Sequence, residues 1–206
     1  MKTKIRILES ALTLFNRLGW VNVTLRDVSA ALNISYGNVT YHYPNKEKLL
    51  ETIYAAYQEG LMEINRSLAE HPDKFLQMLA APSATFQLSL KYRFLFVDFL
   101  ELQRQYPAFM AEVLQSHQQR KQWWKRQLEE LKHSGILRPD ISDYNLEFMM
   151  EMSGMVRTFF FLQPALDEAD LAKLQFAYIS QVNAVLWPYL SEYGLQLARK
   201  AGFFTD

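Results

Sequence analysis

Residues 24–50 of the 206-residue chain read TLRDVSAALNISYGNVTYHYPNKEKLL, and this stretch contains the start signals of successive helices. Thr24 precedes Asp27 by three positions, a spacing at which a hydroxyl and a carboxylate each cap a backbone N–H group of the other residue. Ser35 is the next capping residue, so a very short helix over about 36–41 is expected almost directly after the first. Two helices joined by so short a turn predict a helix-turn-helix.

Longer helices are predicted on both sides of this pair. Upstream, Gly19 follows an amphipathic stretch over about 4–18 at the place where a left-handed C-terminal cap is expected. The apolar positions of that stretch, spaced by three and four, are Ile5, Leu8, Leu12 and Phe15. Downstream, Pro44 ends the short helix, and Asn45 is positioned to cap a long helix that begins at Lys46.

Beyond this helix, prolines, glycines and capping residues divide the chain into further helical stretches. The stretches expected are 73–81, 83–105, 107–134, 143–163 and 167–187, with Pro188 ending or kinking the last one. The sequence therefore predicts an all-α protein of about nine helices. We expect an N-terminal three-helix DNA-binding domain over residues 1–47 and a helical bundle over residues 48–206 for ligand binding and dimerisation.

Within the helix-turn-helix, apolar and polar positions separate into two sets. The set expected to form a small core is Val28, Ala31, Leu32, Ile34 and Val39. The set expected on the exposed side of the second helix is Tyr36, Gly37, Asn38, Thr40 and Tyr41. A helix with such an exposed face fits the major groove of DNA.

The stretch from Thr24 to Leu50 resembles the signature of the TetR family of bacterial transcription regulators. The matching features are the capping Thr, Ser-x-Gly before the second helix, His followed by an aromatic residue, and Asn-Lys-x-x-Leu at the start of the long helix. Asn33 stands where the family usually has Gly, and Asn tolerates a left-handed backbone. Thr40 stands where the family usually has a Tyr that reaches a phosphate, so its shorter arm changes that contact.

The resemblance implies a role for each matching residue. Thr24, His42 and Lys46 are expected to bind phosphates, whereas Arg26, Tyr36 and Asn38 are expected to approach bases. The full expected DNA-binding set is Thr24, Arg26, Ser35, Tyr36, Gly37, Asn38, Thr40, Tyr41, His42 and Lys46. Arg can bind guanine and Asn can bind adenine through paired hydrogen bonds. The alternatives are that Thr24 is only a cap, that His42 is a structural hydrogen-bonding residue, and that the basic residues form a solvated surface.

Composition and charge agree with this interpretation. The first 50 residues carry seven Lys or Arg against three acidic residues, while the other 156 carry fifteen against nineteen. A basic head on an acidic body favours contact of the head with a polyanion. The absence of cysteine excludes disulfides and thiolate metal sites and fits the bacterial cytoplasm. No apolar run is long enough to span a membrane, and no metal or cofactor is expected.

The family resemblance also implies an effector cavity in the C-terminal part, and the apolar surface of the last two long helices predicts a dimer interface there. An apolar or aromatic ligand is expected near Tyr92, Phe96, Phe99, Phe109, Trp123 and Met152, although aromatic residues at helical spacing are also typical of a core. The homodimer interface is expected at Met149, Met155, Phe159, Phe176, Ile179, Val182, Asn183 and Leu186. Two copies are needed to bind both halves of a palindromic operator.

The sequence favours a ligand-responsive, operator-binding repressor. A repressor only has to block a promoter, whereas the C-terminal part of an activator must also contact the polymerase. The alternative is a helical small-molecule-binding or scaffold protein whose helix-turn-helix no longer contacts DNA. An enzyme is not expected, because the four histidines form no close helical pair and no glycine-rich phosphate loop or nucleophile turn occurs.

Overall fold

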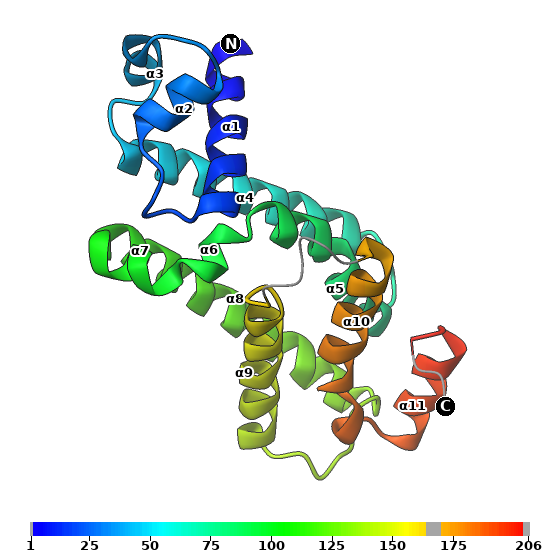
Figure 1. Cartoon of the computed structure of the whole chain (residues 1–206). Coiled ribbons are helices and arrows are strands. Elements are labelled where there is room, and N and C mark those ends of the chain that lie inside the picture. Colours follow the sequence, from blue (N-terminus) through cyan, green and yellow to red (C-terminus); the bar gives the residue numbers. More distant parts are fainter. Residues whose placement is uncertain (1, 164–169, 204–206) are drawn as a thin grey trace. The chain divides into compact units, whose positions relative to one another are not determined.

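The computed structural model describes residues 2–163 and 170–203, which contain eleven α-helices and no β-strand (Figure 1). The helices are α1 (Lys2–Leu18), α2 (Leu25–Ala31), α3 (Tyr36–His42), α4 (Lys46–Ala69), α5 (Lys74–Lys91), α6 (Phe94–Val97), α7 (Phe99–Gln105), α8 (Pro107–His133), α9 (Asp143–Phe160), α10 (Leu171–Ala184) and α11 (Glu192–Lys200). The all-α expectation is confirmed. None of the described helices is both long and apolar enough to cross a membrane.

Helix α1 buries one face and ends as predicted. Gly19 has a φ of 81° and its N–H bonds to the carbonyl of Phe15 at 2.9 Å, which is the expected left-handed cap. The buried side chains are Ile7, Ala11, Leu12, Leu14 and Phe15. Ile5, predicted to belong to the apolar stripe, is instead 51% exposed, because the buried face begins half a turn later.

Helix boundaries between residues 73 and 105 differ from the prediction. Pro82 lies inside α5 and does not divide it. A proline in a helix removes one hydrogen bond, but Phe75, Leu79 and Phe86 on either side of it are fully buried, and this packing outweighs the loss. The helix predicted over 83–105 is instead interrupted twice, before α6 and again at Asp98. The first residues of the stretch predicted over 167–187 lie outside the described residues.

The described residues form two compact units. The first contains residues 2–62 and 88–112, and the second contains residues 63–87, 113–163 and 170–203. The core of the second unit includes Phe75, Leu128, Leu137 and Leu146.

Within the second unit, α11 is fixed to the turn between α8 and α9 by backbone hydrogen bonds. The N–H of Arg138 donates to the carbonyl of Tyr189 at 3.0 Å, and the N–H of Ser191 donates to the carbonyl of Ile136 at 2.9 Å. Leu137 and Leu190 form an isolated antiparallel bridge between these bonds. The C-terminal helix is therefore part of the folded unit.

Candidate DNA-binding site

The start of α2 is fixed by a complete capping box. The Thr24 backbone N–H donates to Oδ2 of Asp27 at 2.7 Å, and the Asp27 N–H donates to the Thr24 hydroxyl at 3.3 Å. The Thr24 hydroxyl also donates to Asp27, and these hydrogen bonds hold the pKa of the Asp27 carboxyl below its usual value. The box places Arg26 in the first turn of α2, where its side chain is exposed.

The turn between α2 and α3 has the backbone that the sequence predicts. Asn33 has a φ of 52°, in the left-handed region. The N–H of Ile34 donates to the carbonyl of Ser29 at 3.1 Å. Ser35 then caps α3 by accepting a 3.2 Å hydrogen bond from the Asn38 N–H. The turn and both caps together fix the crossing of the two helices.

Helix α3 presents a polar face to solvent. Val39 is fully buried beneath this helix, as is Val28 beneath α2, but Ala31 is exposed and does not belong to the small core as expected. The exposed residues of α3 are Tyr36, Gly37, Asn38 and Tyr41.

Three predicted contact residues make local interactions that bear on their roles. Thr40 is half-buried and its hydroxyl donates to the carbonyls of Tyr36 and Gly37, at 3.2 and 3.3 Å. Tyr41 is 83% exposed, and its ring lies edge-on to that of His42 at 5.1 Å. Of Thr40 and Tyr41, Tyr41 is thus the residue whose side chain is open to solvent.

The structure brings Arg26 and Tyr36 together. The guanidinium carbon of Arg26 lies 4.6 Å from the centroid of the Tyr36 ring, a cation–π distance. Local sequence gives no sign of this contact, because the two residues belong to different helices.

Lys46, predicted to bind a phosphate, is half-buried and directed toward Trp20. Its ammonium group donates a hydrogen bond to the Trp20 carbonyl and lies 4.1 Å from the centroid of the Trp20 ring. Burial lowers the pKa of Lys46 to about 8, although the negative charges of Asp98 and Asp27 oppose this shift. Lys46 is therefore charged at neutral pH, but its ammonium group is bound to Trp20.

Trp20 is also the centre of a contact that the sequence analysis did not identify. Its indole packs against Phe15, Phe94 and Tyr106, with ring centroids 4.8, 6.3 and 5.6 Å away. Its backbone N–H donates to Oδ2 of Asp98 at 2.7 Å. Burial raises the pKa of Asp98. The two partners are 78 positions apart, so no local pattern could have indicated the pair.

Asn16 makes a second connection within the same unit. Its side-chain amide donates to the carbonyl of Lys91 at 2.7 Å and accepts from the N–H of Phe94 at 2.9 Å. It therefore satisfies both a free carbonyl at the end of α5 and a free N–H at the start of α6.

The residues expected to bind an effector lie in two places. In the first unit, Tyr92 and Phe96 pack on Tyr57 at 5.4 and 6.4 Å, and Phe109 packs on Tyr54 at 5.2 Å. Phe99 belongs to the same unit and is half-buried. Tyr54 and Tyr57 were not predicted, although both lie on the apolar stripe of α4.

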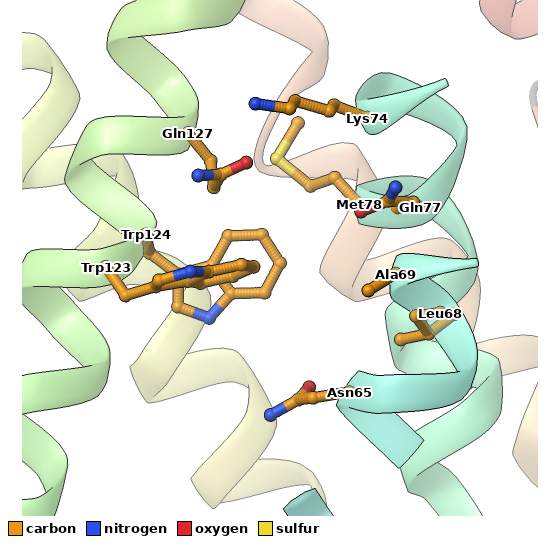
Figure 2. A pocket seen from close by; sticks show the side chains of 9 residues that line it. All are labelled: Asn65, Leu68, Ala69, Lys74, Gln77, Met78, Trp123, Trp124 and Gln127. Carbon is orange, nitrogen blue, oxygen red and sulfur yellow. The ribbon is translucent and has the colours of Figure 1, made fainter. Parts of the chain in front are cut away.

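The other two expected effector residues, Trp123 and Met152, belong to the second unit. Trp123 and Trp124 project from α8 toward the end of α4 and the start of α5, as Figure 2 shows. They line a cavity of about 30 Å³ together with Asn65, Leu68, Ala69, Lys74, Gln77, Met78 and Gln127. This volume is far below the roughly 300–1,000 Å³ of a small-molecule pocket.

The residues expected at the dimer interface divide by exposure. Met155, Phe159 and Phe176 are exposed, the last by 72%, and Ile179 is half-buried. The remaining four are buried within the second unit: Met149, Val182, Asn183 and Leu186. Tyr144 and Phe148, which were not predicted, extend the exposed apolar stripe of α9.

Comparison with known proteins gives two family matches. Residues 7–53 match the family described as bacterial regulatory proteins of the tetR family. Residues 56–197 match the TetR family of bacterial transcriptional repressors.

Curated relatives match over a short stretch of the chain. IcaR, a negative transcriptional regulator of the biofilm operon icaADBC in Staphylococcus epidermidis, is 41% identical over 46 residues, which cover 22% of this chain and 25% of that protein. YttP of Bacillus subtilis, a probable transcriptional regulator, is 28% identical over 60 residues, which cover 29% of each chain. The matches thus span little more than a quarter of these relatives.

Solved structures match over the whole length. A TetR-family regulator from Marinobacter aquaeolei is 27% identical with a TM-score of 0.81, and the match covers 100% of both chains. The ketosteroid regulator of Mycobacterium tuberculosis shares the fold at 18% identity, with a TM-score of 0.73 over 92% of this chain and 96% of that one. These relatives are regulators and not enzymes. With family models matching both the helix-turn-helix and most of the remaining residues, the chain belongs to the TetR family of bacterial transcriptional regulators.

Proposed function

We propose that this protein is a sequence-specific DNA-binding repressor that binds a palindromic operator as a homodimer. The observation that carries the proposal is the exposed face of α3, on which Tyr36, Asn38 and Tyr41 surround Gly37. Gly37 leaves open space beside these side chains, since a Cβ there would contact only the Ser35 hydroxyl, 4.0 Å away. Such a face on a short, capped helix fits the major groove.

The roles we propose for the two parts of the chain are those that the sequence predicts. Residues 1–47 bind DNA in the cytoplasm, and residues 48–206 dimerise and bind an effector. Thr24, Tyr41 and His42 contact phosphates, while Arg26 and Asn38 contact bases. Lys46 contributes its charge to the same surface from a position that Trp20 fixes, so its phosphate contact is electrostatic.

The dimer interface we propose is the exposed stripe of the second unit. It comprises Tyr144, Phe148, Met155 and Phe159 on α9 and Phe176 on α10. Exposed apolar stripes of this length are typical of protein interfaces. A second copy of the chain would cover the stripe with the same residues.

The effector we propose is apolar or aromatic. Aromatic side chains line both sites that contain the expected effector residues, one in each unit. Tyr92, Phe96 and Phe109 lie in one aromatic cluster, and Trp123 lines the cavity in Figure 2. Since that cavity is much smaller than a small-molecule pocket, an effector would have to enlarge it, and such a requirement would give the ligand different affinities for two conformations.

Operator binding is tested by fluorescence-anisotropy titration on the DNA upstream of the protein's own gene. A shuffled duplex of equal length is the control, and both are measured at two salt concentrations. We expect roughly a thousandfold preference for the native duplex and a steep salt dependence. Equal, weak binding to both duplexes, with no sequence recovered by selection from a random DNA library, would favour a helical ligand-binding or scaffold protein that does not recognise DNA.

A further inference from the structure

The stacking of Arg26 on Tyr36 has a consequence for sequence recognition. The guanidinium carbon lies 4.6 Å from the ring centroid, and both side chains are exposed. Within the described part of the chain, Arg26 has no carboxylate partner. Its neighbour Asp27 is occupied by the capping box with Thr24. Tyr36 is therefore the group that restrains the Arg26 side chain.

The geometry of a stacked arginine leaves its hydrogen-bonding groups free. A cation–π contact uses the flat face of the guanidinium, whereas all five N–H donors lie in its plane and point outward. A paired hydrogen bond to O6 and N7 of guanine needs only that edge. A ring over a flat face of the guanidinium leaves the donor edge of Arg26 open to a base, and the 4.6 Å distance from the guanidinium carbon to the Tyr36 centroid fits such a placement.

Caps and hydrogen bonds fix the backbone on both sides of the pair, so the stack has a defined position. Arg26 follows the Thr24 cap directly, and Tyr36 follows the Ser35 cap. The turn that joins their helices is closed by the 3.1 Å hydrogen bond from Ile34 to Ser29. An unrestrained arginine loses side-chain entropy when it is ordered, and here part of that loss occurs on folding.

We propose, on the basis of the proposed DNA-binding function, that Tyr36 is a positioning residue that holds Arg26 in place to recognise one guanine in each operator half-site. Arg26 makes the contact with the base. Tyr36 determines how strongly guanine is preferred at that position through its ring and not through its hydroxyl. The pair acts as one recognition unit that spans both helices of the motif.

The test compares three variants on an operator obtained by selection, with the guanine replaced in one half-site. Arg26→Ala should lose the preference for guanine by about tenfold or more. Tyr36→Leu should lose about two- to fivefold of the same preference, the range expected for an exposed cation–π contact. Tyr36→Phe, which keeps the ring, should stay within about twofold of the wild type.

Two controls separate positioning from direct contact. In an Arg26→Ala background, Tyr36→Leu should have no further effect on the guanine preference. Tyr41→Leu removes an exposed ring from the same helix and should weaken binding to all sequences alike. The proposal is overturned if Tyr36→Leu weakens all sequences equally, if it keeps its effect without Arg26, or if Tyr36→Phe is as impaired as Tyr36→Leu.

A measurement without DNA tests the stack on its own. The Arg26 Nε–H signal in the NMR spectrum of the free protein should be shifted upfield by the Tyr36 ring current. This shift should be retained in Tyr36→Phe and lost in Tyr36→Leu, while the signal of the exposed Arg17 stays unchanged. If the upfield shift is present but the protein shows no preference for any DNA sequence, the proposed DNA-binding function is overturned. If the protein binds its operator specifically but the upfield shift is absent, only the role of Tyr36 is overturned.

Discussion

The backbone N–H of Trp20 donates a 2.7 Å hydrogen bond to Oδ2 of Asp98, and the same tryptophan accepts a hydrogen bond from Lys46 at its carbonyl. Both backbone polar groups of Trp20 are therefore satisfied by side chains that are distant in sequence. The end of α1, the start of α4 and the break between α6 and α7 meet at this point within the first unit.

Asp98→Ala should destabilise the protein by about 1–3 kcal/mol, because it leaves the part-buried Trp20 N–H without an acceptor. Asp98→Asn keeps an acceptor oxygen and should cost clearly less. Urea unfolding, monitored by far-ultraviolet circular dichroism, measures both. Equal losses for the two variants would show that the charge of Asp98, and not the hydrogen bond, stabilises this contact.

Operator affinity should fall as the pH rises through about 8, because Lys46 then loses its proton and its charge. Its pKa in the folded protein is lowered from the ordinary value of 10.5 to about 8, so half of the charge is lost at about that pH and most of it above roughly pH 9. Anisotropy titrations from pH 7 to pH 9.5 should also show the salt slope decreasing by about one unit. Lys46→Arg, which stays charged, is the control. A pH dependence that persists in that variant would assign the effect to another group.

Gly194→Ala should destabilise the second unit by about 1–3 kcal/mol, since the new Cβ would lie 2.3 Å from the carbonyl oxygen of Ile136. Gly154→Ala on α9 is the matched control, because no atom lies within 4 Å of a Cβ at that position. That variant should gain about 0.5–1 kcal/mol from the higher helix propensity of alanine. Thermal unfolding of the two proteins checks the contrast. A Gly194→Ala protein as stable as the wild type would mean that α11 is not held against Ile136.

Phe159→Glu should weaken the dimer about a hundredfold or more, because an unpaired charge in an interface costs roughly 3 kcal/mol. Phe159 is 64% exposed in the isolated chain, so the substitution should leave the fold of the monomer intact. Tyr193→Glu on α11 is the control, since it changes an exposed aromatic residue outside the stripe. Sedimentation equilibrium measures both. A dimer that Phe159→Glu does not weaken would exclude the α9 stripe as the interface.

The features that the sequence predicted correctly depend on residues a few positions apart. The Thr24 box, the Ser35 cap and the hydrogen bond from the Lys48 N–H to the Asn45 side chain each span three residues. The left-handed Asn33 is equally local. Their hydrogen-bonding groups lie on adjoining backbone, so the pattern of side chains is enough to place each helix start.

The aromatic residues show where sequence reasoning is weaker. A run of rings at helical spacing predicts burial, and Tyr92 and Phe109 are indeed buried. It does not distinguish the core of one unit from a ligand site, because both need apolar surface. Which rings meet, such as Tyr57 with Tyr92, depends on how the helices pack.

By itself, the sequence determined the helix-turn-helix, its caps and the helical class of the whole chain. Only the tertiary structure decided that Lys46 turns toward Trp20, that Arg26 stacks on Tyr36, and that α5 continues through Pro82 but ends at Lys91. The physical reason is the same in each case. A side chain such as Asn16 can compensate a free backbone group only when packing brings it there, and 75 residues separate Asn16 from the carbonyl it satisfies.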